Sequence, residues 1–272
     1  MNIALRISIM ILTVLVGLAV GSFLNVVIYR LPNDMSLSKP ASHCPKCKEP
    51  IKGYDNIPLI SYIVLRGKCR HCKEHISFRY PMIELVNTVL WFTALTLFTN
   101  VVVPSFECNW FKFAASLIAI SSLICICMCD YDHMLIPDIL QGVLLVGAIV
   151  MLLDKPSFET ILLKVIGFVS MGLLFYLVNL VFKLSHKKDG LGSGDIILVM
   201  IGGLLLGVYQ MIFALLISCL SALVILVTIT IVKKDKEKEY PFAVFLTTGI
   251  LVSLFVGEYV INWYMNLIGG LF

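Results

Sequence analysis

Two aspartates lie at the edges of apolar stretches in a chain that otherwise keeps charge away from such stretches. Asp130 follows the apolar run Ala114–Met128, and Asp195 closes a Gly-Ser-Gly-Asp motif. A carboxylate at a membrane boundary is costly, and for that reason it indicates function. Two carboxyls that meet in space share one proton, so one acts as a base on water while the other polarises a carbonyl. The pair predicts aspartic protease chemistry, with Gly192 and Gly194 allowing close backbone approach.

Four cysteines form two Cys-x-x-Cys pairs with 21 residues between them: Cys44 and Cys47, then Cys69 and Cys72. Four thiolates at this spacing are typical of a tetrahedral zinc site, which would stabilise a segment too short to build a large core. A structural site is favoured over a catalytic one, because four thiolates leave no open coordination position. Two disulfides are the alternative, which a reducing cytoplasm disfavours.

Other polar residues near these motifs have simpler interpretations. Asp132 is expected to be a solvated loop acid, and Asp138, which follows Pro137, fits the cap of a helix. The chain is expected to contain no internal repeat. The five remaining cysteines are interpreted as small buried hydrophobes: Cys108, Cys125, Cys127, Cys129 and Cys219.

The composition is that of a polytopic membrane protein. Of the 272 residues, 59% are hydrophobic and 14% are charged, against about 25% charged in a soluble domain. The mean hydropathy is +0.96. Eight apolar stretches are predicted to be transmembrane helices: Ile7–Tyr29, Met82–Val103, Ala114–Met128, Ile139–Leu153, Ile161–Phe182, Ile196–Leu206, Gln210–Val232 and Ala243–Trp263. Seven is the main rival count, because only three residues separate the sixth stretch from the seventh.

The distribution of positive charge predicts the orientation. With the loop after the first helix in the cytoplasm, 17 of the 21 Lys and Arg residues lie in cytoplasmic segments. This topology puts both termini outside and both aspartates at the cytoplasmic face. The fold class is therefore an all-α polytopic membrane protein with three parts: a first transmembrane helix (1–29), a small cytoplasmic zinc-binding loop domain (30–81) and a transmembrane catalytic domain (82–272). The net charge of +4 arises from the cytoplasmic loops, so it favours contact with anionic lipid and not with nucleic acid.

Four motifs, in order along the chain, resemble those of the type IV prepilin peptidases, a GxGD-type family of aspartic proteases. The amino-terminal part of the resemblance is carried by Gly21–Pro32 and by the double Cys-x-x-Cys loop together with Ile76–Glu84; the rest is carried by Asp130–Asp138 and Gly192–Asp195. By position in these motifs, the family's two catalytic aspartates fall on Asp130 and Asp195. Many members carry Lys two residues after the second aspartate, where this chain has Ile197.

The resemblance implies an activity and its partners. Members remove the short basic leader of type IV prepilin or pseudopilin precursors at the cytoplasmic face of the bacterial inner membrane. Many then methylate the new amino terminus with S-adenosylmethionine, whose binding residues the sequence does not indicate. The lipid bilayer is the second expected partner, and neither the sequence nor the resemblance specifies an oligomeric state.

Two alternatives belong to other classes of protein. A cation transporter or channel would also use intramembrane carboxylates, but it would favour acids near the midplane and broken helices in repeated halves. An enzyme that only methylates would leave both aspartates structural, and the chain contains no soluble Gly-rich nucleotide-binding pattern.

Overall fold

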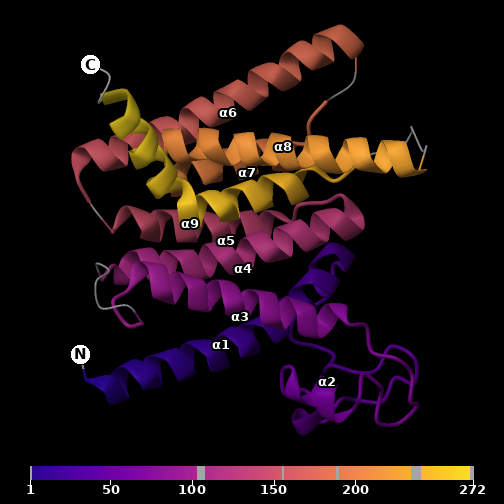
Figure 1. Ribbon diagram of the computed structural model, residues 1–272. Coiled ribbons are helices and arrows are strands. Elements are labelled where there is room, and N and C mark those ends of the chain that lie inside the picture. The colour runs from indigo at the N-terminus through magenta and orange to yellow at the C-terminus, as the bar shows by residue number, and fades with distance from the viewer. Residues whose placement is uncertain (1, 103–107, 155, 188–189, 234–239, 270–272) are drawn as a thin grey trace. The chain divides into compact units, whose positions relative to one another are not determined.

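The computed structural model describes residues 2–102, 108–154, 156–187, 190–233 and 240–269, which form helices and two isolated β-bridges (Figure 1). The chain divides into two compact units, Met1–Cys108 and Asn109–Phe272. This division does not test the predicted three-part organisation, which stays a prediction.

The first unit is built on a pair of long helices, α1 (Ile3–Arg30) and α3 (Arg79–Phe98). They approach closely because Gly21 lies against α3, where a Cβ atom would come 2.7 Å from the Cα of Glu84. Buried amides join the two backbones: Asn87 Nδ2 donates to the carbonyl of Gly17 at 2.8 Å, and Asn25 Nδ2 to that of Tyr80 at 3.2 Å. Small residues and interhelical hydrogen bonds are the usual means of helix association in a bilayer.

The loop between these helices contains short elements only. They are the 3₁₀ turns η1 (Leu31–Asn33) and η2 (Gly53–Asp55) and the five-residue helix α2 (Ile60–Val64).

The second unit contains six helices among its described residues. Helices adjacent in sequence pack as pairs, α4 with α5, α6 with α7 and α8 with α9, while α5–α7 and α4–α9 contacts join the pairs. Their bounds are α4 Trp110–His133, α5 Asp138–Leu152, α6 Phe158–His186, α7 Ser193–Leu206, α8 Val208–Lys233 and α9 Phe242–Gly269.

Each of the eight predicted apolar segments corresponds to one of the long or medium helices, although α3 ends at Phe98 and the predicted limit at Val103 lies outside the described residues. Six helices are long and apolar enough to cross a membrane, while α5 and α7 have 15 and 14 residues. At 1.5 Å per residue these two reach roughly 21 to 23 Å, which is less than the hydrocarbon thickness of about 30 Å. The break between α7 and α8 is real, because Gly207 has φ +85° and ends the first helix. Each predicted segment therefore has its own helix among the described residues, in agreement with the count of eight and not with the rival count of seven.

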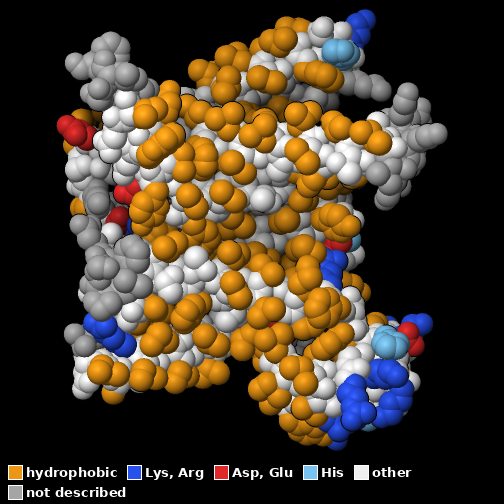
Figure 2. Space-filling model, in the orientation of Figure 1, with side chains coloured by type: hydrophobic (Ala, Val, Ile, Leu, Met, Phe, Trp, Pro, Cys, Tyr) orange, Lys and Arg blue, Asp and Glu red, His pale blue; other side chains and the backbone are white. Residues whose placement is uncertain are grey.

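Three of the simpler sequence interpretations were wrong. Asp132 is exposed as expected, but it lies in the last turn of α4 and not in a loop. Asp138 is the first helical residue of α5, the cap position belongs to Pro137, and no side chain caps this helix. Cys125 and Cys129 are buried as expected, but Cys108 and Cys219 are exposed. Cys219 lies on an outer surface of α8, where hydropathy alone does not distinguish lipid contact from burial in protein. Hydrophobic side chains indeed cover much of the helical surface in Figure 2.

Candidate active site and metal site

Asp130 lies in the last turn of α4, where it is 6% exposed. The helix ends with Met134 in a left-handed conformation, and the Met134 N–H donates to the Asp130 carbonyl at 2.8 Å. The backbone N–H groups of Ala243 and Val244, in the first turn of α9, lie within hydrogen-bonding reach of the Asp130 carboxyl. Its Oδ2 atom is buried and has no hydrogen-bond partner among the described residues. Such an orphan in a native fold requires an explanation, and a catalytic role is one.

Asp195 lies in the first turn of α7, directly after the glycine motif. The turn before it is fixed by Asn179 of α6, whose Oδ1 accepts from the N–H groups of Gly190 and Leu191 at 2.9 and 3.0 Å. From α5, Gln141 Nε2 donates to the carbonyl of Gly194 at 3.0 Å. The start of α7 is therefore held by polar side chains from two neighbouring helices.

The two glycines of the motif differ in their surroundings. A Cβ atom at Gly194 would lie 3.2 Å from Cβ of Ile136, so this position requires the smallest residue for close packing. Gly192 has φ −66°, which any residue adopts, and a Cβ there would meet only Asp195 Oδ2 at 3.4 Å. The structure therefore explains a glycine at position 194, where the backbone packs closely against Ile136, but it does not explain one at position 192.

The structure brings Asp130 and Asp195 to the same end of the second unit. That end holds the last turn of α4 and the first turns of α5, α7 and α9 (Figure 1), and the two carboxyls are close enough for their charges to interact. Asp132 and Asp138 are both exposed. Two acids at one end of the unit, one of them with an unpaired buried oxygen, are the groups that aspartic protease chemistry requires.

Three contributors to this site were not found from the sequence. The backbone N–H groups at the start of α9 carry no side-chain signal at all. Gln141 and Asn179 did give a signal, since each is an amide within a predicted apolar span. Ile197, which replaces the Lys of many relatives, is 40% exposed.

The four cysteines of the loop form a cluster. The sulfur atoms of Cys44, Cys47, Cys69 and Cys72 all lie within 4.8 Å of one another, which is suitable for a single metal ion. Each pair forms the same knuckle: the Cys44 N–H donates to the Glu49 carbonyl at 3.0 Å, and the Cys69 N–H to that of Glu74 at 2.8 Å.

The expectation of no internal repeat was therefore wrong at short range. Residues 44–51 and 69–76 both read Cys-x-x-Cys-Lys-Glu-x-Ile. Their isolated β-bridges also correspond, His43 with Pro50 and Lys68 with His75. The repeat is only eight residues long, which hides it from a search for structural repeat units.

The thiols of the cluster affect one another's ionisation. The backbone N–H of Cys47 lowers the pKa of the Cys44 thiol to about 6, outweighing the opposing effect of burial. At Cys47 the backbone N–H of Glu49 favours the thiolate, but burial and the neighbouring sulfurs prevail and raise the pKa to about 11. Four thiolates in this space need a positive charge between them.

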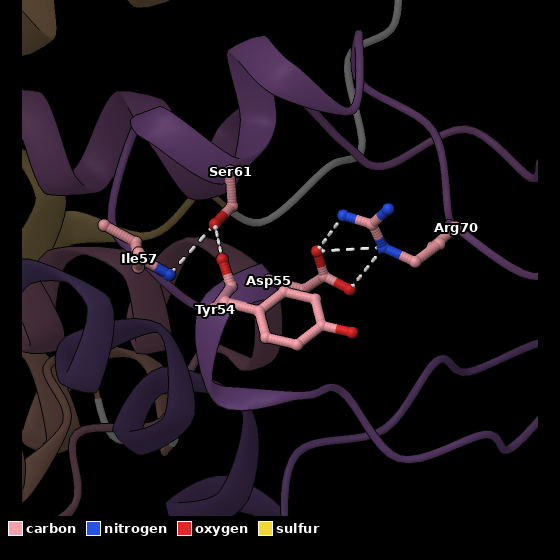
Figure 3. Close-up of polar contacts among 5 residues, drawn as sticks. All are labelled: Tyr54, Asp55, Ile57, Ser61 and Arg70. Atoms are coloured by element: carbon pink, nitrogen blue, oxygen red, sulfur yellow. Dashed lines mark hydrogen bonds and ion pairs between the residues drawn. The ribbon is translucent and has the colours of Figure 1, made fainter.

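A salt bridge supports the second knuckle (Figure 3). Arg70, which lies between Cys69 and Cys72, donates from Nε to Asp55 Oδ2 at 2.8 Å and from Nη2 to Oδ1 at 2.6 Å. Hydrogen bonding to Arg70 holds the pKa of the Asp55 carboxyl below its ordinary value. The guanidinium also lies 5.5 Å from the centroid of the Tyr54 ring. These contacts connect the cysteine cluster to the segment that precedes α2.

Comparison with known proteins assigns the chain to a family. The model for the bacterial peptidase A24 N-terminal domain matches residues 15–98, and the model for the type IV leader peptidase family matches residues 117–227. A prepilin leader peptidase/N-methyltransferase of Legionella pneumophila is 33% identical over 93% of each chain. This chain belongs to the type IV leader peptidase family.

Other members are similar over the same extent. Proteins with the same name from Neisseria gonorrhoeae and Pseudomonas aeruginosa are 31% and 32% identical, over 94% of this chain and 94% and 93% of theirs. No solved structure matches the chain. The resemblance predicted from the motifs is thereby confirmed, and family membership gives no support to a transporter or channel.

Proposed function

We propose that this chain is an aspartic endopeptidase that removes the leader peptide of type IV prepilin-like precursors and methylates the new amino terminus. The observation that carries the peptidase proposal is the buried, unpaired Oδ2 of Asp130 at the end of the unit that also holds Asp195. Family membership supports prepilin processing and N-methylation together, as in the names of the relatives.

The proposed cleavage uses a shared proton. The N–H groups of Ala243 and Val244 would help to orient the Asp130 carboxyl, and its Oδ2, which has no partner among the described residues, is available for a proton or a water molecule. The ionised member of the pair removes a proton from water as the water attacks the scissile carbonyl, and the protonated member donates a hydrogen bond to the carbonyl oxygen. The proton taken from water then passes to the leaving amine as the peptide bond breaks. Because the acids titrate as a pair, the roles belong to the pair and not to one residue.

The proposed location is the cytoplasmic boundary of a bacterial inner membrane. The excess of Lys and Arg in the loops on that side supports this orientation. The short lengths of α5 and α7 support a water-accessible recess, since both helices begin beside the aspartates and neither spans the hydrocarbon. A substrate with a cytoplasmic basic leader and a membrane helix would present its scissile bond at this depth.

We also propose that the methyl donor binds in a cavity of the first unit. The cavity has a volume of about 410 Å³, within the range of small-molecule pockets. Its lining fits the chemistry of S-adenosylmethionine: Phe23 and Pro58 offer apolar contact for adenine, hydroxyls and an amide suit the ribose, and Arg30 offers positive charge for the carboxylate. The polar residues of this lining are Ser22, Ser38, Ser42, Asn56 and Arg30.

Arg30 gives this cavity its charge. Arg30 is 6% exposed, and its guanidinium donates to the carbonyls of Ser36, Leu37 and Pro40 at 2.6 to 3.2 Å. A guanidinium has five N–H donors, so donors remain for a ligand carboxylate. The bound cofactor would supply an electrophilic methyl group to the free amine, and the chain's part is to bind and orient it.

The metal proposed for the cysteine cluster is zinc. Four convergent thiolates are a donor set that closes a tetrahedral site, so the ion would stabilise the loop and take no part in cleavage.

Mass spectrometry of a processed substrate tests both activities. The purified protein is incubated with a full-length prepilin in detergent, with and without S-adenosylmethionine carrying a deuterated methyl group. We expect loss of the leader in both samples and one labelled methyl group in the second. An unprocessed prepilin would contradict the peptidase proposal. Binding of S-adenosylhomocysteine by calorimetry, weakened at least about tenfold by Ser22→Leu, tests the cavity independently of activity.

Orientation is tested by labelling. Single cysteines placed at exposed Asp132 and at exposed Ser193 should react with an impermeant thiol reagent in inverted vesicles and not in intact cells without an outer membrane. Reaction of the two positions from opposite sides would contradict a shared site.

A further inference from the structure

Helix α2 carries an exposed apolar face on the cysteine loop. Ile60, Ile63 and Val64 are 57%, 73% and 67% exposed, and Phe78, just before α3, is 66% exposed. In Figure 2 the small lobe that holds this loop is covered by hydrophobic side chains on one side and by Lys and Arg on another. Clustered large apolar side chains on one short element normally contact a partner.

The orientation of this face is fixed by hydrogen bonds. Ser61, 9% exposed, donates from Oγ to the Tyr54 carbonyl at 3.0 Å and accepts from the Ile57 N–H at 3.0 Å (Figure 3). Because Ser61 faces inward, its neighbours Ile60 and Ile63 are turned outward. The hydrogen bonds of Ser61 thus hold the apolar side chains of α2 in their exposed positions.

The level of α2 along the membrane helices is fixed as well. The N–H of Leu59, directly before α2, donates to Glu84 Oε2 at 2.9 Å, and the hydroxyl of Ser22 also bonds to the Glu84 carboxyl. Glu84 lies five residues into α3 and Ser22 lies eight residues before the end of α1. At 1.5 Å per residue, α2 begins roughly 7 to 12 Å inside the ends of these two spans.

The neighbouring surface of α3 is already of the lipid-facing kind. Met82, Leu85 and Val86 are 50%, 50% and 41% exposed at the level of Glu84. The apolar face of α2 therefore lies at the level of an apolar surface that a bilayer must cover.

Basic residues follow the apolar face in sequence. Arg66 and Lys68 come two and four residues after α2, and both are exposed. The whole loop, residues 31–78, has eight Lys and Arg residues against four acids. A basic element with an apolar face is the combination that binds at anionic membrane surfaces.

We infer that α2 inserts its apolar face, Ile60, Ile63 and Val64, into the boundary of the lipid bilayer, with Arg66 and Lys68 contacting anionic phospholipid headgroups. The cysteine loop is then an interfacial element held against the membrane, not a domain suspended in the cytoplasm. This inference is separate from the peptidase proposal and needs only that α1 and α3 cross a bilayer.

Lipid is favoured over a protein partner by two of these observations. The face lies at the same level as the exposed apolar surface of α3. Its basic residues are opposite in charge to acidic phospholipids. A second copy of this chain would bring the same basic residues together and would repel.

Site-specific photo-crosslinking identifies what touches the face. Ile63 is replaced by p-benzoylphenylalanine, and the protein is reconstituted in vesicles of phosphatidylethanolamine with phosphatidylglycerol as the minor lipid. Glu49, exposed in the first knuckle, receives the same amino acid as the matched control. After irradiation, mass spectrometry of the protein identifies the adducts.

We expect phospholipid adducts at position 63 at several times the yield at position 49. Phosphatidylglycerol should be enriched among them relative to its share of the vesicle, and Arg66→Gln combined with Lys68→Gln should abolish the enrichment. Adducts to a second copy, to residues 109–272 or to added prepilin in place of lipid would overturn the inference. Lipid adducts without enrichment would overturn the headgroup assignment. Monodisperse elution of each variant in detergent checks that it folds.

Discussion

The carboxyl of Asp130 is only partly supplied with hydrogen-bond donors. Backbone N–H groups of α9 lie within reach of it, while Oδ2 is buried without a partner among the described residues. A purely structural aspartate would be expected to use both oxygens, because an orphaned buried acceptor costs roughly 1 to 3 kcal/mol. That cost is understandable where the oxygen must exchange a proton with a second acid and with water.

Asp130→Asn and Asp195→Asn should each reduce prepilin cleavage by at least about 100-fold. An amide cannot share the proton, although it preserves the shape of the side chain. The rate is measured by mass spectrometry of the released leader. Asp132→Asn and Asp138→Asn, two exposed acids of the same segment, are the matched controls and should retain cleavage. A single Asp130 or Asp195 variant with a normal rate would remove the pair from the mechanism.

Sequence was most informative for residues that must be one chemical type. The clustering of the four cysteines and the placement of the two aspartates at one end of the second unit could be predicted, because the motif spacings are specific; the catalytic role of the aspartates stays a prediction. The donors from Ala243 and Val244 could not be predicted, since a backbone N–H is available from any residue but proline. The fold alone decides which backbone groups reach Asp130.

Gly194→Ala should lower kcat/KM for cleavage by about tenfold, and Gly192→Ala should lower it less. The added methyl group at position 194 would press on Ile136 at 3.2 Å and shift the turn that carries Asp195. Displacements of this order at a catalytic group are costly to the rate. Steady-state kinetics on one prepilin measures both variants. Equal effects at the two positions would argue against packing at Gly194 as the cause.

Among the elements, the apolar helices were predicted well and their interruptions less well. Hydropathy located all eight because each is a continuous apolar stretch, and Gly207 marks the one break that composition left ambiguous. Several helices extend beyond the predicted segments, as does α6, which reaches His186, whereas α3 ends at Phe98, before the predicted limit. Polar residues continue a helix at the membrane surface, where water can satisfy them, so hydropathy does not detect the true end.

Gly167→Ala should destabilise the protein by about 1 to 3 kcal/mol through overpacking between α6 and α7. Gly167 lies against the carbonyl of Gly203, and neither backbone can yield without moving its helix. Gly142→Ala on α5, where a Cβ meets nothing within 4 Å, is the control and should be neutral or slightly stabilising. Thermal unfolding in detergent should show a lower midpoint for the first variant only. A lowered midpoint for both would point to a general intolerance of helix substitutions.

At the scale of the whole molecule, two units correspond to two family models. The first unit includes the match at residues 15–98, and the second includes the match at residues 117–227. The sequence predicts a further boundary near residue 82, where composition changes from a polar loop to an apolar helix, and the three-part division stays a prediction. Within the first unit, α3 packs against α1 through Gly21 and the buried amides, although the cysteine loop separates these helices in sequence.

Removing the metal should therefore loosen one unit and spare the other. Cys69→Ser takes away one of four ligands, and we expect bound zinc to fall from about one ion per chain to a small fraction, because three thiolates hold zinc far more weakly. Limited proteolysis should then cut within residues 31–78 at a higher rate, since short elements without a core depend on the ion.

The second unit provides the internal comparison for that experiment. Its helices pack on one another without a contribution from the cysteine cluster, so protection of residues 109–272 should be the same with and without metal. Cys219→Ser, which removes an exposed thiol of α8 outside the cluster, should keep both the zinc and the protection. Elemental analysis measures the bound zinc, and limited proteolysis measures the protection of each unit. Zinc retained by Cys69→Ser would refute the four-cysteine site, and equal loss of protection in both units would refute their independence.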